Sequence, residues 1–121
     1  MTASDASVEK GFHGLSDAQV ALMRQILAPY VNRIARVDIF GSRATGTYRA
    51  SSDIDLSLRG HVDEALLARL TTLFIESRLP FKVDLHAYDA IAYAPLKDIV
   101  DRQGRPFLTR DDLLCEEKTG S

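Results

Sequence analysis

Two carboxylates stand on one side of a predicted strand, a fixed distance after a Gly-Ser turn. The stretch that carries them reads FGSRATGTYRASSDIDL, from Phe40 to Leu56. Strict alternation of polar and apolar residues places Asp53, Asp55 and Ser57 outward on one face. Asp is depleted in strands, and two like charges 5 Å apart repel by about 3 kcal/mol at an effective dielectric near 20. A bridging divalent cation would offset that repulsion, so the pair predicts a metal site.

A third acid follows the same pattern in the next strand-like segment. Residues Phe81 to Ala87 read FKVDLHA, with Asp84 on the polar side between Lys82 and His86. The intervening segment, Val62 to Leu79, has apolar residues at helical spacing and is predicted to be a crossover helix on one face of a sheet. The polar sides of both strands then converge on the opposite face or at one end, and Asp84 can join the pair.

Three carboxylates after a Gly-Ser turn form a constellation suited to nucleoside triphosphate chemistry. The backbone amides and hydroxyl of Gly41 and Ser42 could hold a phosphate. Mg²⁺ prefers carboxylates together with substrate phosphate oxygens as ligands. Two such ions, about 3.5 to 4 Å apart, stabilise the attacking and leaving oxygens of an in-line displacement. The residues therefore indicate one or two Mg²⁺ ions and phosphoryl-group chemistry.

The spacing of these residues resembles a known family signature. Gly41-Ser42, ten intervening residues and then Asp53-Ile54-Asp55 are similar to the signature of the DNA polymerase beta-like nucleotidyltransferase superfamily. The fuller run GSRATGTYRASSDIDL resembles its small members, the minimal nucleotidyltransferase (MNT) family. The likeness extends from about Leu15 to Leu114, and Asp84 in Val-Asp-Leu agrees with it.

This resemblance implies an α/β fold of the α+β kind, with a small mixed β-sheet flanked by helices. In it Asp53 and Asp55 are metal ligands, and Asp84 is the third carboxylate and the candidate general base for the acceptor hydroxyl. Gly41 and Ser42 hold the triphosphate.

Two arginines near the turn are further candidate phosphate ligands. Arg43 directly follows the Gly-Ser turn, and Arg49 lies in the loop from Thr47 to Ser52, which we expect to lead to the mouth of the site. A bidentate guanidinium suits a triphosphate, although arginine is more often an ordinary surface charge. Both residues are therefore predicted nucleotide contacts, with the surface role as the alternative.

The resemblance also implies a partner and a reaction. Minimal members often pair with a HEPN-domain protein in toxin–antitoxin modules, where some transfer AMP from ATP to the partner. The predicted function is thus Mg²⁺-dependent transfer of a nucleoside monophosphate to a hydroxyl of a HEPN toxin. One alternative is a non-catalytic module that neutralises a HEPN ribonuclease by docking, and a weaker one is modification of a small molecule. A homo- or hetero-oligomer is left open.

Length and composition set wider limits. The 121 residues carry a net charge of -2, 45% hydrophobic residues and one cysteine. This predicts one domain, and the lack of a basic excess argues against direct nucleic-acid binding. The single cysteine excludes an internal disulfide, and no window reaches the 18 or so apolar residues of a membrane helix, so a cytoplasmic protein is expected.

The remaining pattern divides the chain into elements. We expect residues 1–14 to form a flexible arm, 15–114 a single domain and 115–121 a flexible tail. Helical spacing, strand alternation and Pro and Gly positions predict the following elements: a helix from Ser16 to Val31, a strand from Ile34 to Phe40, a helix from Pro95 to Gln103, an edge strand from Arg105 to Leu108 and a last turn from Asp111 to Leu114.

Overall fold

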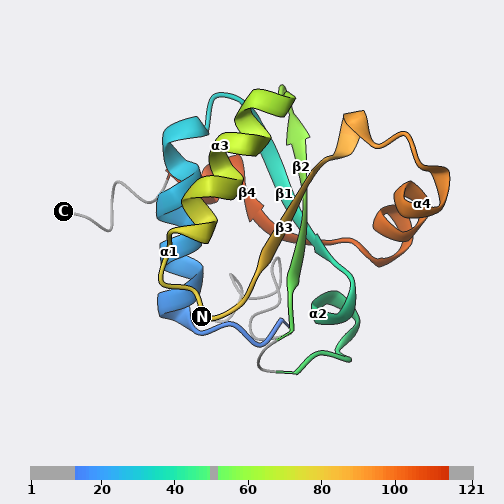
Figure 1. Cartoon of the computed structure of the whole chain (residues 1–121), viewed down its shortest axis with the longest axis horizontal. Coiled ribbons are helices and arrows are strands. Elements are labelled where there is room, and N and C mark those ends of the chain that lie inside the picture. Colours follow the sequence, from blue (N-terminus) through green and yellow to red (C-terminus); the bar gives the residue numbers. More distant parts are fainter. Residues whose placement is uncertain (1–12, 50–51, 115–121) are drawn as a thin grey trace.

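A four-stranded mixed sheet forms the centre of the protein, seen in a computed structural model that describes residues 13–49 and 52–114 (Figure 1). The strands lie in the order β3-β2-β1-β4. Their bounds are β1 Ile34–Phe40, β2 Ile54–Gly60, β3 Val83–Ala87 and β4 Arg105–Thr109. β1 is antiparallel to β2 and β4, whereas β2 and β3 are parallel. The predicted mixed sheet flanked by helices is confirmed.

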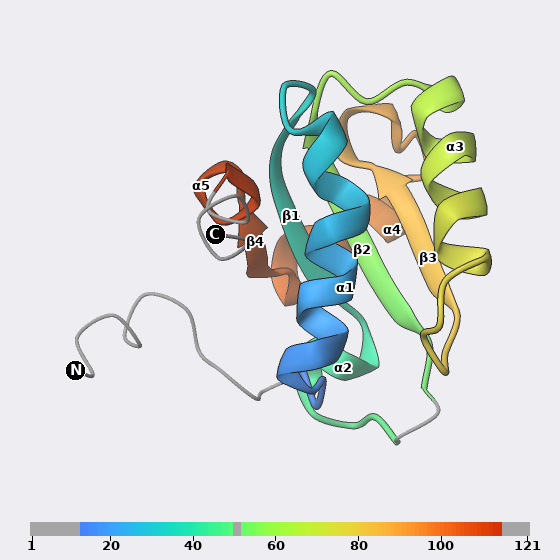
Figure 2. The ribbon, with the colours of Figure 1, turned by 90° about the vertical axis from the view of Figure 1, so that its left-hand side faces the viewer.

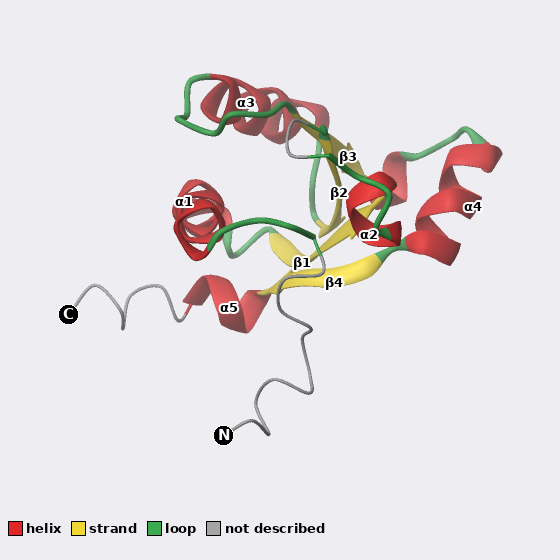
Figure 3. Cartoon of the chain, turned by 90° about the horizontal axis from the view of Figure 1, so that it is seen from below, coloured by secondary structure: helices red, strands yellow, loops and turns green. Residues whose placement is uncertain are grey.

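Two helices pack side by side on one face of this sheet (Figures 2 and 3). α1 (Asp17–Leu27) begins with a capping box, in which the side chains of Ser16 and Gln19 each accept a hydrogen bond from the other residue's backbone N–H. α3 (Glu64–Ile75) begins at Asp63, whose side chain accepts from the Leu66 N–H. α3 joins the parallel strands β2 and β3, as the predicted crossover helix requires.

The hydrophobic core lies between these helices and the sheet. Ile54, Leu56 and Leu58 of β2 are at most 1% exposed, and they face Met23, Leu27, Leu66, Leu70 and Phe74 of the helices within one cluster. Burying one such side chain stabilises the fold by about 1.5–3 kcal/mol. The apolar side of β2 is therefore the side predicted from its alternation.

The polar face of the sheet is covered in part by α4 (Ala94–Gln103), which lies opposite α1 and α3 (Figure 3). Gly104, which ends α4, lies against Asp38 of β1, since a Cβ at Gly104 would be 3.8 Å from the Asp38 Cβ. Asp38 pairs in register with Ser57, and Ser57 is fully buried. The outward exposure predicted for Ser57 is wrong, because a helix from a distant part of the chain packs over this face.

Four short elements complete the described chain: η2 Ala28–Tyr30, α2 Ser42–Thr45, η3 Tyr88–Ala90 and α5 Arg110–Leu114. The first predicted helix ends at Leu27 and continues as the 3-10 turn η2, where Pro29 takes an early position. The predictions for residues 1–12 and 115–121 lie outside the described residues. Within the described ranges, no helix is long and apolar enough to cross a membrane.

Candidate active site

Asp55 and Asp84 lie directly beside each other on neighbouring parallel strands. They are register partners in the β2–β3 ladder, where adjacent strands are about 4.8 Å apart. Both side chains therefore leave the same face of the sheet, and both are partly buried. Asp53 comes one residue before β2 and is exposed. The structure thus brings two of the predicted carboxylates together in register and places the third beside them in sequence.

The predicted Gly-Ser turn lies against the same carboxylate. Phe40, the last residue of β1, pairs with Asp55, so Gly41 follows directly beside it. Gly41 has a φ of 80° and a ψ of -155°, and a Cβ there would lie 2.5 Å from the Asp55 Oδ2. Only glycine combines this backbone conformation with such a close approach. The turn and the acid pair are therefore neighbours in space as well as in the sequence motif.

The charges at this site are only partly compensated. Burial raises the pKa of Asp55, and the nearby negative charges of Asp84 and Asp53 raise it further, against the opposing effects of His86 and Lys82. The Lys82 Nζ lies 3.5 Å from the Asp84 Oδ1, but the Lys82 side chain is largely exposed to solvent, which weakens this pairing. A raised carboxyl pKa means that added positive charge would stabilise the ionised site.

The donor set fits a hard divalent cation, although no ready-made metal cage is formed. Among residues 13–49 and 52–114, no three His, Cys, Asp or Glu side chains are gathered closely enough to hold an ion as they stand. The candidate ligands are all carboxylates, the class that Mg²⁺ prefers, and they suffer mutual repulsion that a cation would relieve. Mg²⁺ is usually held by one or two carboxylates plus substrate phosphates. The residues therefore fit Mg²⁺ that arrives with a nucleotide.

Comparison with known proteins identifies the family. The family model described as Polymerase beta, Nucleotidyltransferase matches residues 23–113, which contain the Gly-Ser turn and the three acids. The chain belongs to this nucleotidyltransferase family. The predicted resemblance is confirmed, and so is the fold that it implied. No curated protein sequence matches the chain.

Several solved structures similar to this nucleotidyltransferase are toxin–antitoxin structures. One, a toxin–antitoxin with AMP-PNP, is 25% identical with a TM-score of 0.61, and the match covers 83% of this chain and 82% of that chain. Another, the toxin–antitoxin MntA-HepT, is 21% identical with a TM-score of 0.58, and covers 86% of this chain and 83% of that chain. The second likeness, at its lower identity, concerns the fold alone.

Arg43 of the nucleotidyltransferase does not project into solvent as a phosphate ligand would. Only 1% of the residue is exposed, and its guanidinium donates hydrogen bonds to the carbonyl oxygens of His13 and Ser52. This placement gives no support to the predicted triphosphate contact, because the donors are committed to the backbone. Arg49 is exposed, and its backbone N–H donates to the Ser52 Oγ at 2.7 Å. Its nucleotide contact remains a prediction.

Gln103 is a contact of the Gly-Ser turn that the sequence pattern did not single out. The Gly41 N–H donates to the Gln103 Oε1 at 3.2 Å, across 62 residues of sequence. The first turn of α2 is closed by bonds from the N–H groups of Ala44 and Thr45 to the Gly41 carbonyl. Gln103 ends a helix with ordinary spacing, so no local signal could have revealed this contact.

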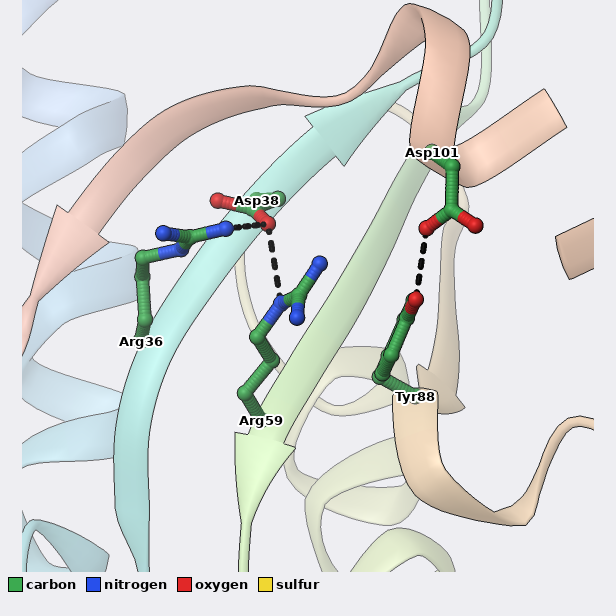
Figure 4. A network of polar contacts seen from close by, with 5 residues as sticks. All are labelled: Arg36, Asp38, Arg59, Tyr88 and Asp101. Carbon is green, nitrogen blue, oxygen red and sulfur yellow. Dashed lines mark hydrogen bonds and ion pairs between the residues drawn. The ribbon is translucent and has the colours of Figure 1, made fainter. Parts of the chain in front are cut away.

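A network of charged and aromatic side chains lies further along the same face (Figure 4). Asp38 is buried and accepts from Arg36 at 2.8 Å and from Arg59 at 3.4 Å. The Arg59 guanidinium stacks 3.8 Å from the centre of the Tyr88 ring, and the Tyr88 hydroxyl donates to Asp101 of α4 at 2.6 Å. This network fastens α4 to the sheet and was also missed, because its members are separated in sequence.

Proposed function

We propose that this nucleotidyltransferase moves a nucleoside monophosphate, AMP from ATP, to a hydroxyl of a partner protein. The partner is a HEPN-type toxin, and the chain is its antitoxin. The observation that carries the proposal is the register pairing of Asp55 with Asp84 directly beside Gly41. Family membership supports the reaction class. Similarity to a toxin–antitoxin crystal structure that contains AMP-PNP supports the donor and the kind of partner.

Asp53, Asp55 and Asp84 would hold Mg²⁺, one ion or two. When bound, Mg²⁺ neutralises the triphosphate and stabilises charge on the attacking and leaving oxygens. Gly41 and Ser42 would orient the triphosphate, with Gly41 leaving room for it because it has no side chain. Arg49 is the remaining candidate for a phosphate contact.

The family resemblance makes Asp84, on the edge strand β3, the candidate general base. It would accept the proton of the acceptor hydroxyl. The acceptor oxygen then forms a bond to the α-phosphorus, and the bond from that phosphorus to the bridging oxygen breaks, releasing pyrophosphate. Positioning and charge do most of this work in phosphoryl transfer.

The test is a transfer assay with the neighbouring gene's product. The protein, ATP, Mg²⁺ and that partner are mixed, and the mass of the partner is measured. We expect a mass increase of one AMP that is lost with Asp53→Ala/Asp55→Ala and kept with the exposed-site variant Asp89→Asn. If no nucleotide is transferred from any triphosphate tried, the catalytic proposal is refuted.

A non-catalytic antitoxin would give a different result in the same experiment. If the Asp53→Ala/Asp55→Ala variant still suppresses the toxin when present in equal amount, docking is sufficient and transfer is not the mechanism. Modification of a small molecule would be revealed by nucleotide transfer to that compound in the absence of any partner protein.

A further inference from the structure

Arg43 joins the three chain segments that carry the candidate site. Its own backbone belongs to α2, directly after the Gly-Ser turn. Its guanidinium contacts Ser52 in the segment before β2 and Phe81 in the segment before β3. A residue that is only 1% exposed and that contacts all three segments is placed to fix their relative positions.

The first contact is with the segment that leads into Asp53. The Arg43 Nε and Nη2 donate to the Ser52 carbonyl at 3.2 and 3.1 Å, and Nη2 donates to the Arg49 carbonyl at 3.3 Å. Ser52 is the residue before Asp53, so this bidentate grip acts one peptide unit from the first acid. Ser52 also holds the loop itself through its bond from the Arg49 N–H.

The second contact is with the segment that leads into Asp84. The Arg43 guanidinium carbon lies 5.0 Å from the ring centre of Phe81 and also 5.0 Å from that of Tyr48. The backbone carbonyl of Lys82, which follows Phe81, accepts a hydrogen bond from the Ile54 N–H at 2.9 Å, and Ile54 lies between Asp53 and Asp55. The Arg43 guanidinium thus contacts both the segment before β2 and the segment before β3, at the end of the sheet where these two parallel strands begin.

Arginine suits this position for a reason of geometry. Its planar fork provides five donors in fixed directions and two flat faces for aromatic rings, whereas a lysine ammonium is a single point charge. Truncating or replacing Arg43 would leave the partly buried carbonyl of Ser52 without these guanidinium donors. Loss of the fork should therefore loosen both acid-bearing segments together.

We propose that Arg43 is a positioning residue that sets the placement of Asp53 and Asp84 relative to the Gly-Ser turn. Its effect on metal binding rests on the function proposed above, whereas its effect on the segments does not. Partners of metal ligands typically change metal affinity by about 10–100-fold when mutated. Arg43 acts through the backbone one residue from Asp53 and not on the ligand side chain itself, so we expect a loss near the lower end of that range for Arg43→Lys and Arg43→Ala.

The test combines two measurements on the full chain. The first is Mn²⁺ affinity, with Mn²⁺ as the probe ion, by calorimetry. The second is hydrogen exchange at the Ile54 and Thr45 amides, which report on the strand entry and on the turn. Arg110→Lys is the matched control, because the Arg110 Nε also donates to backbone carbonyls, those of Val31 and Ile34, at the other end of β1.

The proposal predicts weaker Mn²⁺ binding and faster exchange of the Ile54 amide in both Arg43 variants. Millimolar methylguanidinium should partly restore both properties in Arg43→Ala. Arg110→Lys should match the wild type in both measurements. Wild-type affinity and exchange in Arg43→Lys would overturn it. If the wild-type protein binds no metal, either alone or with a non-hydrolysable ATP analogue present, the proposed function fails, and the exchange data alone decide the positioning role. If neither Arg43 variant folds, Phe81→Leu, which removes one ring from the guanidinium, must speed Ile54 exchange, and unchanged exchange overturns the proposal.

Discussion

The strongest physical prediction concerns the cost of placing Asp55 beside Asp84 without a cation. Asp55→Asn keeps the shape and removes one charge. Two charges about 5 Å apart repel by at most about 3 kcal/mol at an effective dielectric of 20. Lys82, 3.5 Å from Asp84, and exposure to solvent reduce this, so we expect the variant to be more stable by about 1 kcal/mol in a chelator. For a domain of this size the melting temperature then rises by about 4 °C.

The pH dependence follows from the raised pKa of Asp55. A carboxyl whose pKa is higher in the folded than in the unfolded protein favours folding while it is protonated, and that contribution is lost as pH rises through the folded-state pKa. Wild type and Asp55→Asn should therefore melt at similar temperatures near pH 4 and diverge towards pH 7. Mg²⁺ should raise the melting temperature of the wild type more than that of the variant.

The assay is thermal unfolding by circular dichroism across this pH range, with and without Mg²⁺. Asp89→Asn is the control, since it changes the net charge equally at an exposed carboxylate in η3. If Asp55→Asn melts at or below the wild-type temperature at pH 7 in chelator, while Asp89→Asn is neutral, the inferred repulsion between the acids is refuted.

Two further predictions use contacts that the structure describes. Gly41→Ala and Gly46→Ala both force alanine into a positive φ, near 80° and 88°, but only the first Cβ meets a carboxylate, because nothing lies within 4 Å of a Cβ at Gly46. We expect Gly46→Ala to lose about 1 kcal/mol and Gly41→Ala clearly more, measured by urea unfolding, and equal losses would contradict the close approach. Asp38→Ala should destabilise the fold by about 1–3 kcal/mol, because it leaves Arg36 and Arg59 without their shared carboxylate. In a double-mutant cycle, Asp38→Ala should cost less stability when Arg59 is also replaced by alanine.

Local pattern was sufficient to predict the elements and the position of the acid pair. The strand predicted from Ile34 to Phe40 has those bounds in the structure, and the crossover helix and the parallel pairing of its strands are present. Alternation with period two placed Asp55 and Asp84 on the polar sides of their strands, but left open whether these sides converge on the face opposite the crossover helix or at one end of the sheet. In the structure, the β2–β3 register places Asp55 directly beside Asp84. The sequence spacing favoured this arrangement but could not determine the register.

The sequence could not predict what covers the polar face or where the Arg43 guanidinium goes. Ser57 alternates as an outward residue but is buried, because α4 returns over the sheet from 40 or so residues later in the chain. Arginine is usually a surface residue, yet Arg43 is buried. The backbone carbonyls that it binds belong to His13 and Ser52, whose positions depend on the whole fold. Periodicity assigns faces, whereas only tertiary packing decides which faces stay open.

The two faces of β2 explain how the chain tolerates this site. On one face, Ile54, Leu56 and Leu58 are buried, and together they contribute about 5–9 kcal/mol at 1.5–3 kcal/mol for each side chain. On the other face, the repulsion around Asp55 is expected to oppose folding by about 1 kcal/mol. The stabilising term exceeds the opposing one several-fold within a single strand. The fold can therefore tolerate the partly compensated negative charge at this site, where a cation would bind, because burial on the opposite face of β2 stabilises it.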